Sequence, residues 1–210
     1  DEYLPAVRFD FFPYGGINRP VLLAETPAQG LTGWRATSDL TGATLAVEAS
    51  AGAMIRASLS DAAGATFTTA SLAEGRADLR VEPSTPRLWS PENPHLYRLD
   101  IEVLDAGGQM IDAASQPIGL RTFTIDGARF LLNGEPIILK GFGKHEESPL
   151  HGRGLNLPQL VKDFHLLQWI GANSVRTSHY PYSEEFLDLA DRFGVLVIDE
   201  VFSINLDFRR

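Results

Sequence analysis

Acidic and histidine side chains follow three short β-type runs in the last third of the chain. The first cluster is residues 144–147, the second is residues 178–182, and the third is Asp199 with Glu200. Enzymes built from alternating strands and helices carry their active-site groups at the carboxyl ends of the strands. One such cluster alone would more often be an ordinary solvated loop, but three in succession favour a functional site.

Carboxylates in these clusters invite a test for glycosidic hydrolysis, because the retaining reaction needs two carboxyl groups about 5 to 5.5 Å apart. Asp199 and Glu200 are adjacent in a predicted strand, where successive side chains point to opposite faces, so they cannot both face one substrate. Glu146 and Glu200 come from different strands and could converge. Glu184 and Glu185 open a predicted helix, where the helix dipole is a sufficient explanation for them.

Histidines occur in two of the clusters. His145 and His179 could hydrogen-bond ligand hydroxyl groups, because a neutral imidazole offers one donor and one acceptor. Each could equally be a loop histidine bonded to the backbone. No His-x-x-x-His pair or third ligand accompanies them, so no metal site is predicted. The sequence also has no nucleophile elbow, phosphate loop or dinucleotide fingerprint, and no cofactor is expected.

The elements that must position these clusters alternate between strand and helix. Residues 130–140 predict a hairpin across Asn133 and Gly134, and then a strand that ends in a loop at residues 141–143. Apolar residues at helical spacing between Pro158 and Gly171 predict an amphipathic helix.

The same alternation continues to the end of this part of the chain. A short strand is predicted over residues 174–178, and a second helix runs from Ser183 to Gly194. A nearly all-apolar strand follows at residues 195–199. Strand, helix, strand, helix, strand indicates a parallel sheet.

The middle of the chain has a different pattern. From about residue 21 to 124, short β-type runs such as 44–48, 55–59 and 96–103 alternate between apolar and polar residues. Turn residues at 61–64 and 105–108 separate them. About seven strands in a hundred residues predict an immunoglobulin-like β-sandwich.

The domain organisation follows from these patterns and from length. We expect the sandwich at 21–124 and an incomplete α/β domain at 125–210. The last segment holds two and a half βα units, whereas a complete (β/α)8 TIM barrel needs about 250 residues. Because an apolar parallel strand normally needs cover on both faces, this segment should be only marginally stable alone.

The overall composition limits the classes of partner. The chain has 210 residues, 44% of them hydrophobic, and a formal charge of -9, which is typical of a globular protein. A net negative charge without a basic cluster argues against a nucleic-acid partner. No apolar run approaches the roughly 20 residues that span a bilayer, so no membrane partner is expected. Cysteine is absent and residues 1–5 show no signal peptide; location stays open, with the cytoplasm favoured.

Five segments carry a resemblance to a known family. They are FDFFPYGGINRP at 9–20, LWSPENPHLY at 88–97, KGFGKHE at 140–146, WIGANSVRTSHYPY at 169–182 and VIDE at 197–200. The chain thereby resembles glycoside hydrolase family two, and within it the β-glucuronidases. This resemblance implies the C-terminal edge of a sugar-binding jelly-roll domain at 1–20, the immunoglobulin-like domain at 21–124 and the start of the TIM barrel at 125–210.

The resemblance also implies roles for individual residues. It makes Asp10 a sugar-contacting aspartate from the first domain and His179 a histidine that lines the glycone pocket, with His145 at the matching first-strand position. Behind the pocket it places three supporting residues: Arg176, Tyr180 and Glu200.

Neither catalytic glutamate of the family has a counterpart among these residues. The resemblance therefore implies part of a retaining β-glycosidase that acts on β-D-glucuronides, inactive as this chain alone, with a full enzyme that could form a homo-oligomer. Two alternatives stay open: a β-galactosidase of the same family, and a non-catalytic carbohydrate-binding or assembly module.

Overall fold

A computed structural model of the chain describes residues 16–50, 52–71 and 75–201. These residues divide into two compact units. The sandwich unit spans Ala24–Ile138, and the barrel unit combines the described residues of Asp1–Leu23 and Leu139–Arg210. The predicted domain bounds at residues 20 and 124 remain predictions, because compactness by itself does not define a domain.

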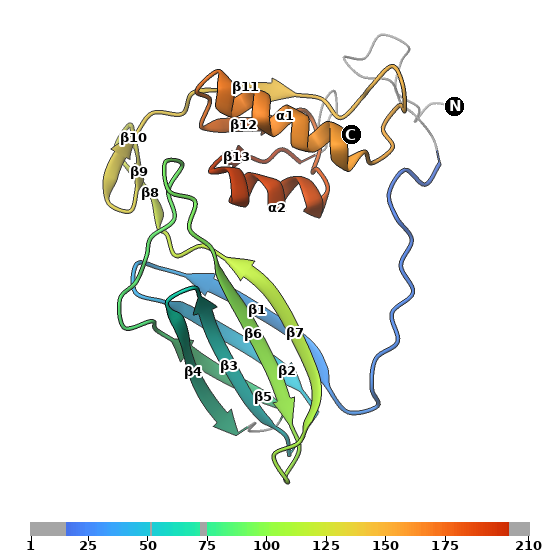
Figure 1. Cartoon of the computed structure of the whole chain (residues 1–210), viewed down its shortest axis with the longest axis vertical. Coiled ribbons are helices and arrows are strands. Elements are labelled where there is room, and N and C mark those ends of the chain that lie inside the picture. Colours follow the sequence, from blue (N-terminus) through green and yellow to red (C-terminus); the bar gives the residue numbers. More distant parts are fainter. Residues whose placement is uncertain (1–15, 51, 72–74, 202–210) are drawn as a thin grey trace, which may run out of the picture. The chain divides into compact units, whose positions relative to one another are not determined.

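Within the described residues of the sandwich unit, seven antiparallel strands form the sandwich itself in two sheets, ordered β1-β2-β5 and β4-β3-β6-β7 (Figure 1). This is the immunoglobulin-like arrangement that the alternating sequence predicts. The strands are β1 Leu31–Ser38, β2 Ala43–Ala49, β3 Met54–Asp61, β4 Gly64–Ser71, β5 Arg76–Val81, β6 Tyr97–Leu104 and β7 Met110–Ile118.

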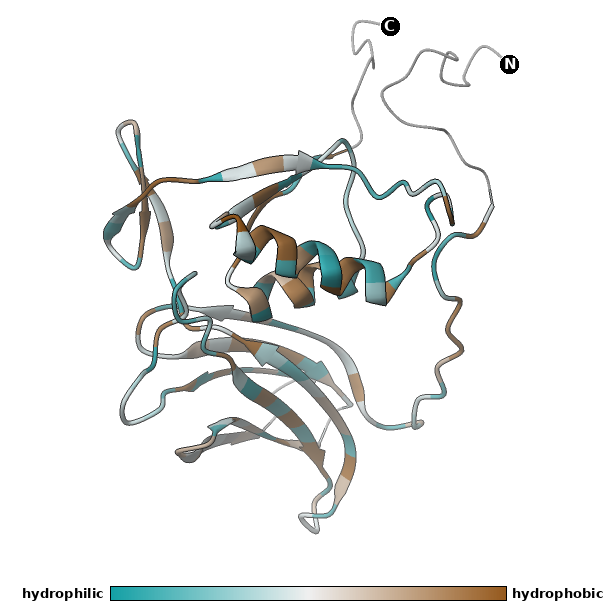
Figure 2. Cartoon of the chain, turned by 45° about the horizontal axis from the view of Figure 1, so that its top comes forward, coloured by the Kyte–Doolittle hydropathy of each residue, from teal (hydrophilic) through white to brown (hydrophobic). Residues whose placement is uncertain are grey.

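The two-residue period of these strands is visible as alternating colour along them in Figure 2. In β2 and β6, every second side chain faces the other sheet and is buried, for example Leu45 and Leu99 at 0% exposure. Burial of one face on each sheet removes apolar surface from water and forms a continuous core. The predicted turns at 61–64 and 105–108 lie where β3 meets β4 and β6 meets β7.

A small three-stranded sheet, ordered β10-β9-β8, follows the sandwich. It comprises β8 Phe123–Asp126, β9 Arg129–Leu132 and β10 Glu135–Ile137. The predicted hairpin across Asn133 and Gly134 is confirmed, since both residues have positive φ, 55° and 86°, as a tight two-residue turn requires.

The barrel unit contains the predicted order of strands and helices, β11-α1-β12-α2-β13, with all three strands parallel. The elements are β11 Gly141–Lys144, α1 Leu157–Trp169, β12 Ser174–Thr177, α2 Glu184–Phe193 and β13 Leu196–Ile198.

Local signals set the helix ends. The Asn156 side chain accepts a hydrogen bond from Gln159 N at 3.1 Å and caps α1, and Ser183 caps α2 through Phe186 N at 3.2 Å. Gly194 ends α2 in the left-handed conformation at φ 73°. Among the described residues, neither helix is long and apolar enough to cross a membrane.

One predicted element is wrong. Residues 141–143 were expected to form a loop after a strand, but Gly141–Lys144 is itself strand β11, paired in register with Ser174–Thr177. Glycine has low strand propensity, which is why the pattern indicated a loop. A Cβ at position 141 would overlap the Ser174 carbonyl oxygen, so the close approach of the two strands requires glycine there.

Candidate functional site

The parallel register of β11, β12 and β13 brings the three predicted polar clusters to one edge of the sheet. Lys144 pairs with Thr177, and Arg176 pairs with Ile198, so the chain leaves all three strands at the same level. The loops that follow carry His145, His179 and Glu200.

His145 and His179 lie together, as expected for two residues that follow neighbouring strands. Their ring centroids are 5.4 Å apart and the ring planes meet at 84°, an edge-to-face arrangement. The His179 side chain is 18% exposed and that of His145 is 34% exposed, so both rings are partly open to a ligand. Their role as sugar contacts stays a prediction.

Glu200 holds His179 and Arg176 at once. His179 Nδ1 lies 2.7 Å from Glu200 Oε2, and Arg176 Nη1 donates a hydrogen bond to Glu200 Oε1. The hydrogen bond from His179, followed by that from Arg176, lowers the pKa of Glu200 below its usual range. Glu200 is therefore ionised near neutral pH and can only accept, which places the shared proton on His179 Nδ1.

Asp199 and Glu200 lie just beyond β13 rather than within the predicted strand, which ends at Ile198. Asp199 accepts a hydrogen bond from Thr177 Oγ1 at 2.7 Å, whereas Glu200 contacts Arg176 and His179. The two carboxylates therefore have different partners, and the expectation that they do not face one substrate stays a prediction.

Tyr180, the remaining predicted support residue, is 4% exposed. The Arg153 guanidinium lies 3.9 Å above its ring, and burial is the main reason that the pKa of Tyr180 is raised. Its support of a sugar pocket stays a prediction. Asp10 lies outside the described residues, so its predicted sugar contact also stays a prediction.

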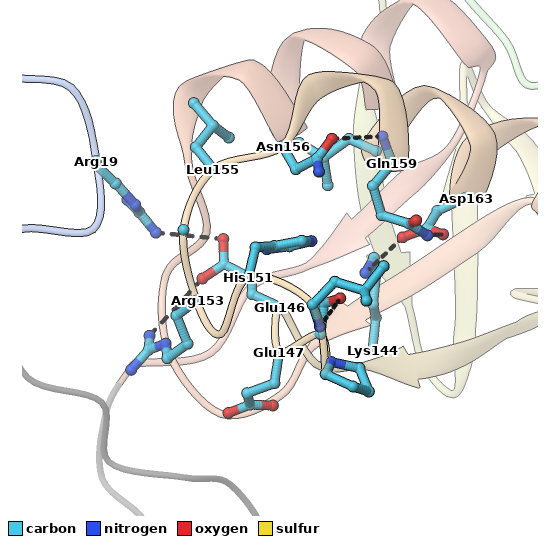
Figure 3. Close-up of a pocket in the computed structure, with 15 residues that line it drawn as sticks. Arg19, Lys144, Glu146, Glu147, His151, Arg153, Leu155, Asn156, Gln159 and Asp163 are labelled. Carbon is cyan, nitrogen blue, oxygen red and sulfur yellow. Dashed lines mark hydrogen bonds and ion pairs between the residues drawn. The ribbon is translucent and has the colours of Figure 1, made fainter.

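A cavity of about 470 Å³ beside the β11–α1 loop was not predicted from the sequence (Figure 3). The loop itself, the start of α1 and Arg19 line it. Glu146 lies here with 13% of its side chain exposed, 3.5 Å from Arg19 Nη2 and 3.8 Å from Arg153 Nη2. No sequence pattern links Arg19 to Glu146, because 127 positions separate them.

Burial raises the pKa of Glu146, although the charges of Arg19 and Arg153 lower it in part. Glu146 and Glu200 form their ion pairs with different residues: the first faces Arg19 and Arg153, and the second faces Arg176 and His179. The described part of the chain contains no group of three or more His, Cys, Asp or Glu side chains that could hold a metal ion.

Two family models match the chain. "Glycosyl hydrolases family 2" matches residues 34–121, and "Glycosyl hydrolases family 2, TIM barrel domain" matches residues 123–208. An immunoglobulin-like sandwich followed by parallel strands with two helices agrees with both models, which confirms the predicted fold class. The chain belongs to glycoside hydrolase family 2.

Relatives agree with this assignment. The chain is 44% identical to a β-glucuronidase of Paenibacillus borealis over 204 residues, 95% of this chain and 34% of that protein. It is 38% identical to the Rattus norvegicus β-glucuronidase over 209 residues, 94% of this chain and 32% of the relative. The chain thus spans about a third of the length of these relatives.

Solved structures give the same result. A β-D-glucuronidase of Dictyoglomus thermophilum superposes with a TM-score of 0.81 at 38% identity, covering 96% of this chain and 35% of that one. A Bifidobacterium dentium β-glucuronidase complexed with coumarin-3-O-glucuronide superposes with a TM-score of 0.80 at 36% identity, covering 92% of this chain and 34% of that one. A Ruminococcus gnavus β-glucuronidase in complex with D-glucuronic acid superposes with a TM-score of 0.75 at 36% identity, covering 92% of this chain and 34% of that one.

Proposed function

We propose that this chain is part of a retaining β-glycosidase that hydrolyses β-D-glucuronides, and that these 210 residues alone do not turn substrate over. The observation that carries the proposal is the similarity to β-glucuronidases, at 38–44% identity over nearly the whole chain. The edge-to-face pair of His145 and His179 beside an ionised Glu200 supports it, because these groups suit hydroxyl recognition.

The proposed part of this chain in the reaction is to bind and orient the sugar. The contact between His179 Nδ1 and Glu200 fixes the orientation of the imidazole ring, which we propose as a hydrogen-bonding partner for a sugar hydroxyl group. Arg176 shares the same carboxylate, so it limits the rotation of Glu200 and thereby of the ring. Asp10 would contact the sugar from the preceding domain.

The chemical step belongs to two glutamates that have no counterpart in this chain. In retaining hydrolysis, one carboxylic acid protonates the leaving oxygen while a carboxylate attacks the anomeric carbon and forms a glycosyl-enzyme. Water then attacks that intermediate, with the first carboxylate accepting its proton, and the sugar is released. Each carboxylate described above at the sheet edge is already bound to a cation or a hydroxyl group, which suits a supporting role.

The test compares this chain with the longer product of its gene, read beyond Arg210. With p-nitrophenyl β-D-glucuronide we expect no turnover by the chain and turnover by the longer protein, with little on the matching galactoside. If the longer protein prefers the galactoside, the alternative of a β-galactosidase replaces the proposed β-glucuronidase. Turnover by the chain alone, lost in Glu146→Gln or Glu200→Gln, would instead make those residues catalytic and refute the proposal.

A further inference from the structure

The Glu146 carboxylate lies between two guanidinium groups that come from separate segments of the barrel unit. Arg19 belongs to the extended segment before the sandwich, and Arg153 belongs to the β11–α1 loop. Figure 3 shows both side chains directed at the carboxylate from different sides, Arg19 toward Oε1 at 3.5 Å and Arg153 toward Oε2 at 3.8 Å. Both carboxylate oxygens are therefore directed toward cations.

Arg19 also reaches the β12–α2 loop. Its Nη2 donates a hydrogen bond to the Pro181 carbonyl oxygen at 3.2 Å, and its Nη1 donates to the Tyr182 carbonyl oxygen at 3.4 Å. One guanidinium thus connects Glu146 in the first loop with two backbone groups in the second. A planar guanidinium with five N–H donors suits several acceptors in different directions.

Arg153 makes a second connection between the same loops. It projects from the β11–α1 loop, and its guanidinium lies over the ring of Tyr180 in the β12–α2 loop at 3.9 Å. Tyr182 adds a third connection, because its hydroxyl group donates to the Lys144 carbonyl oxygen, with Ser178 O at 3.3 Å. These contacts are substantially buried, since Tyr180 is 4% and Tyr182 5% exposed.

The connected residues are immediate chain neighbours of the histidine pair. Glu146 follows His145, and Tyr180 follows His179. We propose that Arg19, Glu146 and Arg153, here called the Glu146 brace, set the distance and angle between the His145 and His179 rings. Glu146 is then a positioning residue. Only the expected effect on enzyme kinetics rests on the proposed function.

A competing role for Glu146 is that of a catalytic acid, which a raised pKa would suit. The two roles differ in what Glu146→Gln does to the longer enzyme. Loss of a general acid lowers kcat by about 10²–10⁴-fold. Loss of binding contacts instead raises KM and leaves kcat nearly unchanged, because the affected groups hold the substrate equally in the ground state and the transition state.

The direct test observes the rings in the chain itself. The protein has five histidines, which can be labelled with ¹³C and ¹⁵N and followed by NMR. Glu146→Gln and Arg153→Lys should both shift the ring signals of His145 and His179, and should leave His95 and His165 in place. The matched control is Glu102→Gln, which breaks the Arg56–Glu102 ion pair of the sandwich unit and should shift neither ring of the pair.

Arg153→Lys keeps a positive charge but removes the planar guanidinium that stacks on Tyr180 and faces Glu146, so it tests the brace even where Glu146→Gln unfolds the barrel unit. Unchanged signals of His145 and His179 in a folded Arg153→Lys chain would overturn the proposal, as would a pure kcat loss in Glu146→Gln. A longer wild-type protein without glucuronidase activity would refute the proposed function alone, because the ring signals report the brace independently.

Discussion

Replacing Gly141 with alanine should destabilise the barrel unit through one defined collision. Gly141 pairs with Ser174 across the β11–β12 ladder, and a Cβ at position 141 would overlap the Ser174 backbone carbonyl. A flexible side chain could rotate away, but a carbonyl oxygen within a ladder cannot. The two strands must therefore move apart, and His145, which follows β11, must move with them.

The magnitude follows from the cost of overpacking. Inserting a methyl group into a filled site typically costs 1–3 kcal/mol, and a rigid backbone obstacle places Gly141→Ala at about 3 kcal/mol. Folded domains have about 5–15 kcal/mol of stability. The barrel unit belongs at the low end, because it leaves large apolar side chains open, such as Trp169 at 81% and Ile170 at 51% exposure. The expected loss from Gly141→Ala is thus a large part of the free energy of unfolding of the barrel unit.

Far-ultraviolet circular dichroism during urea unfolding measures this effect. Within the described residues both helices, α1 and α2, belong to the barrel unit, so the helical signal reports that unit. The control is Gly33→Ala in β1, where a Cβ would meet only Glu48 Oε2 at 3.6 Å and should change stability by less than about 0.5 kcal/mol. If Gly141→Ala unfolds at the same urea concentration as wild type, the argument from strand approach is wrong.

Three further predictions concern stability. Asp39→Asn should cost about 1 kcal/mol at neutral pH, a value limited by the 47% exposure of Asp39. The hydrogen bond from Arg80 lowers the pKa of Asp39 in the folded state. The stabilisation is therefore present above the unfolded-state pKa of Asp39 and is lost as pH falls through its folded-state pKa. In strong acid, urea titrations should show that Asp39→Asn and the wild type unfold alike. Ser183→Ala removes the cap of α2 and should cost about 1 kcal/mol in urea titrations of the helical signal, whereas Ser183→Asp should retain most of it. Phe164→Ala should cost about 3–5 kcal/mol and abolish the helical signal while the β signal of the sandwich persists, because Phe164 is fully buried against Phe186; a retained helical signal would contradict this.

The sandwich and the helices of the barrel unit were predictable from the sequence because their signals are local. Alternation in β2 and β6 reflects burial of one face, and Asn156, Ser183 and Gly194 satisfy helix-end groups within a few residues. The segment at Gly141–Lys144 was not predictable in this way. Its strand conformation depends on pairing with Ser174–Thr177, and local propensity favours a loop.

For the candidate site, the sequence by itself determined the three polar clusters and their order along the chain. It determined that His179 and Glu200 follow two predicted parallel strands, since that strand pattern lies in contiguous residues, whereas strand β11 before His145 is defined by its pairing with β12. The tertiary structure alone decided that His179 and Arg176 share one carboxylate and that Arg19 meets Glu146. Those contacts join residues 21 to 127 positions apart, and only packing of the folded chain brings such residues within hydrogen-bonding distance.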